Sequence, residues 1–465
     1  MAAELSAVSQ PGPRDVAGLR EGFGGKLLRP DDADYEAARQ VWNRSIDRFP
    51  NLIARCAGVA DVIGSVNFAR ENGLLVAVRG GGHSFPGHSV CDGGLVIDLS
   101  PMKGIRVDPE SRTARAQAGV LLGELDRETQ AFGLAVPAGI VTHTGLAGLT
   151  LGGGIGWLMR KYGLTIDQLL SVDLVTAEGE LVKASETENA DLFWGVRGGG
   201  GNFGIVTEFE FRLNPVGPIV LAGPVFWPME ESPNVLRFYR EWIAEAPDEL
   251  MTIVVHRKAP PLPFVLPELH GKPIVGVVCC YVGAVEEGER VVEPLKAFGR
   301  PVRTEAVPNP PGDVRPLLPA RVVVLHALMR RGGTYRRGHR HRGRALAQDQ
   351  VPVDRLPDLA ARGAAARVGE DETAFGGRDA GHTFNITAAT ASAEGLDEER
   401  EWVRDFWSAL KPYHAGAYVN FLMEVGEERV REAYGPEKYD RLKVLKRRWD
   451  LENLFRVNQN ISPTS

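Results

Sequence analysis

The first part of the chain alternates short apolar runs with an amphipathic stretch. Apolar residues recur every three to four positions between residues 59 and 72, which predicts a helix with one buried face. Asn72 and Gly73 then form a typical helix stop. Apolar runs of strand length flank this helix at residues 51–55 and 74–79. The pattern therefore predicts a strand–helix–strand unit whose strands can pair in parallel.

The same periodicities predict further elements. An amphipathic helix is expected at residues 121–132. Strands are expected at residues 94–99, 113–117, 171–176 and 205–213. Beyond about residue 215, strand-like runs alternate with charged helical stretches, which indicates an α+β second domain. The clearest of these later segments are strand-like residues 274–281 and 418–423 and the charged helix pattern of residues 427–450.

Residues 308–367 follow neither periodicity. They are rich in Pro, Arg, Ala and Gly, and residues 330–344 hold seven arginines in fifteen positions. Three explanations stay open: a nucleic-acid-binding tail, a disordered insertion and a compensated frameshift, since ordered-looking sequence resumes abruptly at Val368. We interpret His339 and His341 as surface charge rather than as metal ligands, and we assign no function to this segment.

Composition and charge narrow the class of protein. A chain of 465 residues is too long for one ordinary hydrophobic core, which predicts two domains. Its 43% hydrophobic and 25% charged residues are typical of a globular protein. The formal net charge of −6 offers no basic field to a phosphate backbone, so nucleic acid is not expected as the main partner.

The cysteines and the N-terminus bear on the cellular environment. Cys56, Cys91, Cys279 and Cys280 are not spaced as a C-x-x-C metal or redox pair, so free buried thiols and no metal are expected. The N-terminal residues include acidic residues and Pro where a signal peptide needs an apolar run, and no stretch approaches about twenty apolar residues. A cytoplasmic protein without a membrane partner is the expectation.

A first glycine cluster directly follows the second predicted strand. It reads Arg79-Gly80-Gly81-Gly82-His83-Ser84 and continues to Gly87. Consecutive glycines let the backbone approach a pyrophosphate, and their N–H groups can form an anion-binding nest. The cluster lacks the Gly-Lys-Ser/Thr of a P-loop and precedes a strand, not the helix of a Rossmann turn. Alone, it fits a cofactor site and a tight turn with a surface histidine equally well.

Two more glycine clusters lie further along. Residues 137–157 interleave seven glycines with small and apolar residues, a composition that lets backbone lie flat against a planar ligand. Residues 197–204 contain a formal G-x-G-x-x-G, but a predicted strand follows it, which excludes a Rossmann turn. Three clusters in one predicted domain favour one extended ligand over an ordinary glycine-rich β-region.

Taken together, these motifs resemble the FAD-linked oxidases of the berberine-bridge-enzyme-like group, within the vanillyl-alcohol-oxidase superfamily. The resemblance runs in order from about residue 47 to 213 and resumes at the C-terminus. It rests on residues 79–84, 137–140, 152–157, 160–164, 191–194 and 197–204. It implies a two-domain α+β fold of the PCMH-type FAD-binding class, whose substrate domain is an antiparallel sheet covered by helices.

The resemblance also implies domain boundaries. Residues 1–215 together with 427–465 would form the FAD-binding domain. Residues 216–426 would form the substrate domain, with the irregular segment 308–367 inside it.

His83 takes a specific role through this resemblance. The family's histidine after the Gly-Gly run is bound through its ring to the flavin 8α-carbon, and His83 occupies that place. Such a bond would raise the flavin potential. Doubly linked members carry a cysteine directly after the Pro-Ala-Gly-Ile-like segment, where this chain has Val141, so a single attachment is predicted. Leu149 replaces a histidine common in those members, and Thr144 lies near a position that governs oxygen access, which leaves oxidase versus dehydrogenase open.

The family pattern further implies which residues contact FAD. Ser84 and the glycines beside it would hold the pyrophosphate, and Asn458 and Asn460 match a closing segment that returns to the cofactor. The complete predicted set is Arg79, Gly80, Gly81, Gly82, His83, Ser84, Gly87, His88, Pro137, Gly139, Thr142, Thr144, Gly145, Gly148, Leu149, Gly152, Gly153, Gly154, Gly156, Gly204, Ile205, Asn458 and Asn460.

Tyr418 and Asn420 are the predicted catalytic residues. Tyr418-Val419-Asn420-Phe421 resembles the family's Tyr-x-Asn-Tyr strand, which faces the flavin from the substrate domain. A tyrosinate there could take a substrate hydroxyl proton while hydride passes to the flavin. Phe421 replaces the second tyrosine, and the alternative for Tyr418 is a half-buried strand aromatic.

The sequence thus predicts an FAD-dependent oxidoreductase. Its reaction would be two-electron oxidation of a C–H beside an alcohol or amine in a small molecule, a sugar or secondary metabolite, with O2 as the expected acceptor. The alternatives are an NADPH-dependent reductase on the same fold, a flavin-binding protein without turnover and, less favoured, an arginine-rich nucleic-acid adaptor.

Overall fold

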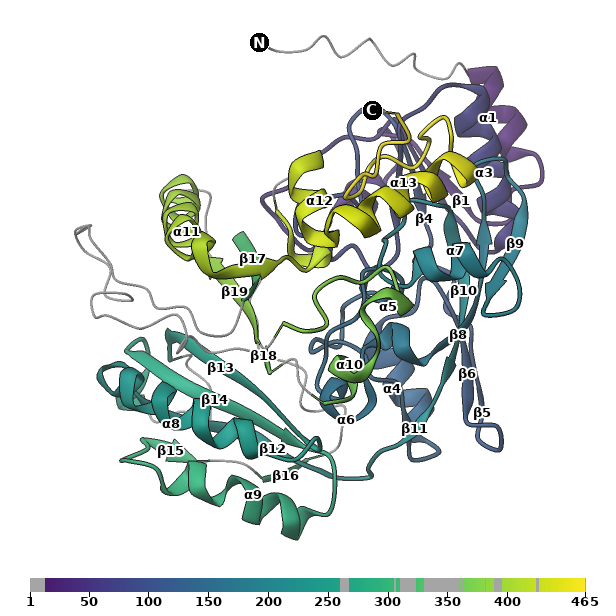
Figure 1. Cartoon of the computed structure of the whole chain (residues 1–465). Helices are drawn as coiled ribbons and strands as arrows, with labels where there is room; N and C mark the ends of the chain where they lie inside the picture. Colours follow the sequence, from purple (N-terminus) through teal and green to yellow (C-terminus); the bar gives the residue numbers. More distant parts are fainter. Residues whose placement is uncertain are drawn as a thin grey trace.

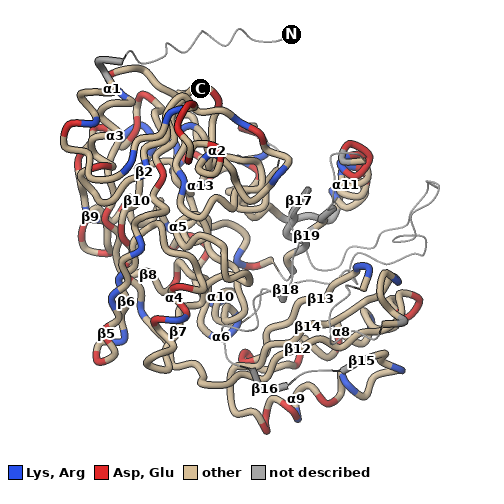
Figure 2. The backbone as a smooth tube through the Cα atoms, turned by 180° about the vertical axis from the view of Figure 1, so that it is seen from behind, with Lys and Arg blue, Asp and Glu red and all other residues tan. Residues whose placement is uncertain are grey.

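The structure, a computed structural model, is shown in Figure 1. It describes residues 13–259, 267–304, 307–309, 323–329, 359–360, 363–380, 382–388, 395–423 and 426–464. The arginine-rich residues 330–344, including His339 and His341, lie outside this part of the chain. Figure 2 shows acidic and basic residues interspersed along the described backbone.

The predicted strand–helix–strand unit is confirmed. β2 (Leu52–Arg55), α3 (Val59–Glu71) and β3 (Val76–Arg79) lead to β4 (Leu95–Asp98), and both β2 and β3 pair with β4 in parallel. β1 (Lys26–Leu28) adds an antiparallel edge, giving the order β1-β2-β4-β3. Two short helices precede the unit, α1 (Pro13–Arg20) and α2 (Tyr35–Arg39). The first glycine cluster therefore starts at the carboxyl end of β3.

A second, antiparallel sheet has the order β5-β6-β10-β8-β9. Its strands are β5 (Ile105–Asp108), β6 (Thr113–Gln117), β8 (Leu169–Val175), β9 (Leu181–Ser185) and β10 (Ile205–Arg212). In β10 the alternation of the sequence sorts the two faces: Phe209 and Phe211 are fully buried, while Glu208 and Glu210 pair with Arg115 across the sheet. The strand after the third glycine cluster is thus confirmed.

The helices between these strands are short. α4 (Leu122–Gln130) confirms the predicted amphipathic helix, and α7 (Ala190–Val196) precedes the third glycine cluster. Within the second cluster, α5 (Leu146–Leu151) is helical, so this segment is not extended throughout; α6 (Met159–Tyr162) follows it. β7 (Leu134–Ala135) and β11 (Asn214–Pro215) form a small separate ladder.

The middle of the chain builds a third sheet with two different faces. Its long strands are β12 (Val220–Pro228), β13 (Leu250–Lys258) and β14 (Pro273–Tyr281), edged by β15 (Arg303–Thr304) and β16 (Val307–Asn309). One face packs under α8 (Ser232–Glu245) and α9 (Val285–Ala297), visible at the lower left of Figure 1. The other face, through Ala222 and Met251, packs against Ile155 and Trp157 of the second glycine cluster.

The chain then returns towards its first half. β17 (Val323–Met329), β18 (Leu359–Ala360), β19 (His382–Ala388) and β20 (His414–Gly416) form a small sheet. α10 (Ala364–Arg367) and α11 (Leu396–Leu410) lie between these strands in sequence. Parallel pairing is confined to β2, β3 and β4, and the other strand pairs of the described chain are antiparallel, which confirms the predicted α+β class.

The strand predicted at residues 418–423 is wrong. After Tyr418 the chain forms a 3-10 turn, η8 (Val419–Phe421), in which the Phe421 N–H donates to the Tyr418 carbonyl at 3.0 Å. Val419 and Leu422 are buried in the core at a spacing of three. The apolar pattern therefore reflects burial of one side of a turn and not pairing in a sheet.

The C-terminal helical pattern is divided in two. α12 (Glu427–Tyr434) ends at Gly435, whose φ of 77° favours glycine, and α13 (Pro436–Trp449) begins with the proline that follows.

The tail after α13 is held by a buried amine: Lys446 Nζ contacts Asp450 Oδ2 at 2.6 Å and the carbonyls of Asn202 and Phe455 at 2.8 and 2.9 Å.

Replacement of this amine should weaken the fold. Lys446→Met leaves the buried Asp450 carboxylate without its counter-charge, so we expect the free energy of unfolding to fall by about 3–5 kcal/mol in urea titrations. Arg448→Gln is the control on the same helix, because the Arg448–Asp191 pair is largely exposed and should contribute below about 1 kcal/mol. Equal losses in the two variants would contradict a central role for Lys446.

Candidate functional site

The first two glycine clusters touch through their backbones. A Cβ added to Gly81 would lie 2.4 Å from the Cα and N of Gly145, and one added to Gly145 would lie 2.4 Å from the N of Gly81. Both positions therefore require glycine. The second cluster is fixed on its other side by Gly123 and Leu122, whose N–H groups donate to the carbonyls of Thr142 and Thr144 at 2.8 and 3.0 Å.

This contact brings two histidines together. His83 Nε2 lies 2.6 Å from Nδ1 of His143, and the indole of Trp42 stacks on the His83 ring with centroids 4.9 Å apart. Burial lowers the pKa of His83 to about 3, and the neighbouring His143 adds to the shift. His83 is consequently neutral at physiological pH. Neither His143 nor Trp42 was among the predicted residues; the signal for His143 was its place as the single histidine in the second cluster.

The segment of residues 42–48 encloses the loop that carries His83. The backbone N–H of Trp42 donates to the Gly82 carbonyl at 3.0 Å. The side-chain amide of Asn43 donates to the Phe85 carbonyl at 2.7 Å. Arg48 reaches the carbonyl of Gly87 at 2.8 Å. These hydrogen bonds from residues 42–48 stabilise the conformation of the loop that carries His83.

The polar residues at the ends of this loop are partly engaged. Ser84 Oγ accepts the N–H of His88 at 3.0 Å, and burial lowers the pKa of His88 to about 4. His88 Nε2 is buried and has no hydrogen-bond partner within the described chain. Arg79 donates to the Ala38 carbonyl, and burial lowers the pKa of its guanidinium.

The second cluster also contacts the third. The N–H groups of Gly198 and Gly200 both donate to the Leu151 carbonyl, at 3.1 and 2.9 Å. Phe375, which the sequence did not single out, wedges against both clusters: a Cβ on Gly153 would lie 2.5 Å from its ring, and one on Gly198 would lie 2.3 Å from its N. All three glycine clusters are thus contiguous in space, as one extended ligand requires.

Other predicted glycines serve packing. A Cβ on Gly139 would lie 2.3 Å from Leu122, and one on Gly156 would lie 2.7 Å from the N of Gly139. Pro137 beside them is buried. A Cβ on Gly204 would likewise lie 2.5 Å from Leu174. Ile205 lies in the core. In contrast, Gly148 faces open space, with nothing within 4 Å of a Cβ placed there.

Tyr418 and Asn420 lie against the Gly152–Gly154 run. The Tyr418 hydroxyl oxygen accepts N–H groups from Gly154 at 3.1 Å and from the Asn420 amide at 2.8 Å, and the same amide donates to the Leu149 carbonyl at 3.1 Å. Burial raises the pKa of Tyr418, while the Asn420 and Gly154 donors oppose the shift. Tyr418 is 2% exposed, so it is a buried residue and not a half-buried strand aromatic.

The C-terminal tail completes the group. The Asn202 amide donates to the Gln459 carbonyl at 3.2 Å, and the Asn458 amide donates to the Gly201 carbonyl at 3.3 Å. Three side-chain acceptors beside these bonds, Asn458 Oδ1, Gln459 Oε1 and Asn460 Oδ1, are buried without a partner among the described residues. Buried acceptors of this kind need donors, and the hydroxyl groups of a dinucleotide such as FAD would supply them.

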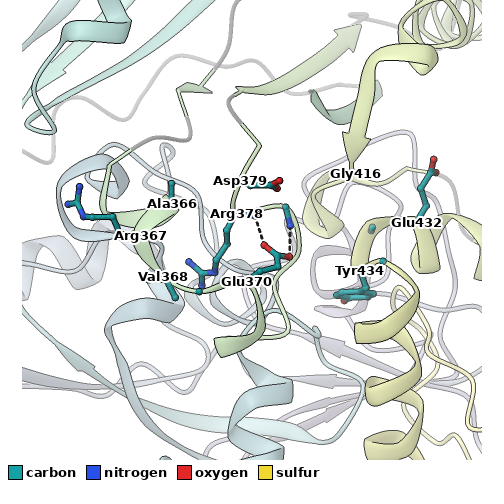
Figure 3. Close-up of a pocket in the computed structure, with 13 residues that line it drawn as sticks. Ala366, Arg367, Val368, Glu370, Arg378, Asp379, Gly416, Glu432 and Tyr434 are labelled. Atoms are coloured by element: carbon teal, nitrogen blue, oxygen red, sulfur yellow. Dashed lines mark hydrogen bonds between the residues drawn. The ribbon is translucent and has the colours of Figure 1, made fainter. Parts of the chain in front are cut away.

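A cavity of about 510 Å³ lies elsewhere, between residues 366–379 and residues 416–435 (Figure 3). Arg378, one of its lining residues, forms a buried ion pair with Asp167, with Nη2 and Oδ1 2.6 Å apart. Glu370 accepts the backbone N–H groups of Gly377 and Arg378 at 3.1 and 3.0 Å, the bonds drawn in Figure 3. None of the predicted site residues lines this cavity.

Comparison with known proteins agrees with this arrangement. Residues 50–185 match the FAD binding domain family, and residues 417–462 match the family described as berberine and berberine like. The chain is 33% identical to (R)-6-hydroxynicotine oxidase of Paenarthrobacter nicotinovorans, over 94% of this chain and 97% of the relative. The chain belongs to the berberine-bridge-enzyme-like FAD-linked oxidoreductases. It is a flavoprotein, and its cofactor is FAD.

Solved structures of this family share the fold. The crystal structure of 6-hydroxy-D-nicotine oxidase from Arthrobacter nicotinovorans has a TM-score of 0.78 and 29% identity, covering 95% of this chain and 98% of that one. Glucooligosaccharide oxidase from Acremonium strictum has a TM-score of 0.78 at 21% identity, covering 97% and 99% of the two chains. The two-domain α+β fold predicted from the motifs is confirmed.

The structure also bears on the cysteines, on metal binding and on membrane-spanning helices. All four cysteines are free and buried, as predicted. Among the described residues, no three His, Cys, Asp or Glu side chains are grouped so as to hold a metal ion. No helix in that part of the chain is both long and apolar enough to cross a membrane.

The backbone contact at Gly81 gives a direct test. Gly81→Ala forces a Cβ into the Gly145 backbone, so we expect about 1–3 kcal/mol of destabilisation in urea unfolding, together with reduced FAD content. Gly18→Ala is the matched control, because it lies in helix α1 with nothing within 4 Å of its Cβ. That variant should keep its FAD and unfold at the wild-type urea concentration or slightly above it. Normal FAD content in Gly81→Ala would refute the requirement.

Proposed function

We propose that this protein oxidises a C–H beside an alcohol or amine of a small molecule and passes the electrons to O2. The FAD is bound covalently, once, through His83. The observation that carries this proposal is the position of His83: a neutral imidazole at the contact between two glycine clusters, held by Trp42 and His143.

The covalent bond is supported by the state of the ring. A nucleophilic imidazole must be unprotonated, and burial keeps His83 so. Glucooligosaccharide oxidase of Acremonium strictum carries a 6-S-cysteinyl, 8α-N1-histidyl FAD. Here Val141 stands where the resemblance expects the second, cysteinyl link, so one attachment is proposed.

The FAD would lie along the contiguous glycine clusters. Backbone N–H groups beside Gly81 and Gly82, with Ser84, would hold the pyrophosphate, and Asn458 and Asn460 would accept hydroxyl protons. We propose residues 1–215 and 427–465 as the FAD-binding domain and residues 216–426 as the substrate domain. When bound, FAD supplies the two-electron acceptor for the oxidation.

Tyr418 is the proposed base. Its oxygen accepts two N–H donors, and donors of this kind stabilise a phenolate. Asn420 is a positioning residue for that oxygen, and its amide is itself held by the Leu149 carbonyl. Because burial raises the Tyr418 pKa, proton removal by this residue becomes faster as the pH rises towards that pKa.

The substrate class follows from chemistry that two relatives share. One is a 6-hydroxynicotine oxidase and the other a glucooligosaccharide oxidase, so one name points to an amine and the other to a sugar. In an amine a C–H bond lies beside nitrogen, and in a sugar a C–H bond lies beside a hydroxyl oxygen. The proposed substrate is therefore a small amine or alcohol.

Acid precipitation tests the attachment. The flavin of the purified yellow protein should remain in the washed pellet and fluoresce with the unfolded chain on a gel. In His83→Ala all bound flavin should appear in the supernatant, because the nucleophile is lost. Release of intact FAD from the wild type would refute the covalent bond.

Tyr418→Phe tests the base. With any amine or sugar that bleaches the flavin anaerobically, we expect the rate of bleaching to fall by about 100-fold or more. The wild-type rate should rise by about tenfold per pH unit below the Tyr418 pKa, and the variant should lose this slope. Tyr239→Phe is the control, since that buried hydroxyl bonds Thr252 beneath α8. An unchanged rate and slope in Tyr418→Phe would exclude the role.

A further inference from the structure

The two ring nitrogens of His83 have different surroundings. Nε2 lies 2.6 Å from His143 Nδ1, whereas no hydrogen bond reaches Nδ1 of His83 from the described residues. Trp42 covers one face of the ring at 4.9 Å with an interplanar angle of 22°. The imidazole is thus held by one edge and one face, and its Nδ1 edge is left for a ligand.

We propose that His143 prepares His83 for flavin attachment: it holds the tautomer whose Nδ1 is the nucleophile and accepts the Nε2 proton as the bond forms. This inference rests on the proposed covalent attachment. The inference adds His143 to the proposed attachment site, as a positioning residue and proton acceptor.

Either ring can donate in this 2.6 Å contact, and the proposal assigns the donor role to Nε2 of His83. When His143 Nδ1 accepts the Nε2–H of His83, the lone pair of His83 lies on Nδ1, since a neutral imidazole carries one N–H. Without this acceptor the proton can occupy Nδ1 and block the nucleophile. The second ring nitrogen therefore sets the reactivity of the first.

A C–N bond forms between Nδ1 and the flavin 8α-carbon, one 8α C–H bond breaks, and the imidazole loses the proton of Nε2. The two electrons and two protons reduce the flavin, and O2, the acceptor of the proposed reaction, reoxidises it and becomes H2O2. The proton from Nε2 passes first to His143 Nδ1.

The surroundings of His143 suit a proton acceptor. His143 is exposed, so its distal nitrogen can release a proton to water, whereas His83 is half-buried. Its main chain is fixed on both sides, by Thr142 and Thr144, whose carbonyls accept N–H groups from Gly123 and Leu122. Hydrogen bonds to Thr142 and Thr144 therefore hold the backbone that places the His143 ring beside His83. Burial also opposes accumulation of charge on His83 itself, which favours transfer of the proton to the exposed partner.

The test measures covalent incorporation, not turnover. Apoprotein is mixed with FAD in air, and samples taken over time are acid-precipitated and scored by flavin fluorescence of the denatured chain. In His143→Ala we expect incorporation to slow by about 100-fold, while FAD that is bound without a covalent bond still co-elutes with the native protein. Added imidazole should restore much of the rate, because position 143 is open to solvent. His270→Ala, which changes an exposed histidine of the third sheet region, should match the wild type.

A second variant separates folding from chemistry. His143→Asn places an amide oxygen near the position of Nδ1, so it can accept the His83 N–H but cannot carry the proton away. It should bind FAD and incorporate it more slowly than the wild type, with a rate that rises with buffer-base concentration. Wild-type rates in both His143 variants would overturn the proposal, as would attachment through Nε2 in NMR spectra of the wild-type flavin peptide. Absence of covalent flavin in the wild type would instead refute the proposed function.

Discussion

The site depends on a close approach between two loops that only glycine permits. Gly81 and Gly145 meet backbone to backbone, with no room for a Cβ on either side. One loop begins at the parallel strand β3, and the other is held by the N-terminus of α4. Their contact places His83 beside His143. The position of the His83 ring thus follows from a steric constraint at Gly81, two residues earlier in the chain.

A second constraint ties the end of the chain to this surface. Lys446 is fully buried and bonded to Asp450 and to two carbonyls from distant segments. A buried charge is costly unless its hydrogen bonds are complete, so these bonds stabilise the tail in the observed position. Docking brings Asn458, Gln459 and Asn460 to the third glycine cluster with acceptors still free for a ligand. In the proposed FAD site, docking of the tail and binding of the cofactor would therefore be coupled.

The two proposed chemical groups are connected through aromatic contacts. Trp42 stacks on His83 and meets Phe85 edge to face at 5.6 Å; Phe85 meets Phe421 at 5.4 Å, and Phe421 meets Tyr418 at 5.0 Å. This row joins the N-terminal segment, the first glycine loop and the C-terminal turn. It joins His83, the proposed attachment residue, to Tyr418, the proposed base. The proposed cofactor-binding residues and the proposed catalytic residues are accordingly connected by direct ring contacts.

Local patterns in the amino-acid sequence were enough to define many elements and the kind of site. Hydrophobic periodicity located α3, β6 and β10, because a helix or strand buries one face at a fixed spacing. The glycine clusters favoured one extended ligand, and the resemblance of the motifs to the berberine-bridge-enzyme-like FAD-linked oxidases implied that this ligand is FAD. Which side chains meet became known only from the folded chain. Phe375 had no local signal, and His143 stood out only as the single histidine of the second glycine cluster. Tyr418 was predicted in a strand but precedes a turn. Long-range packing and not local periodicity places these residues.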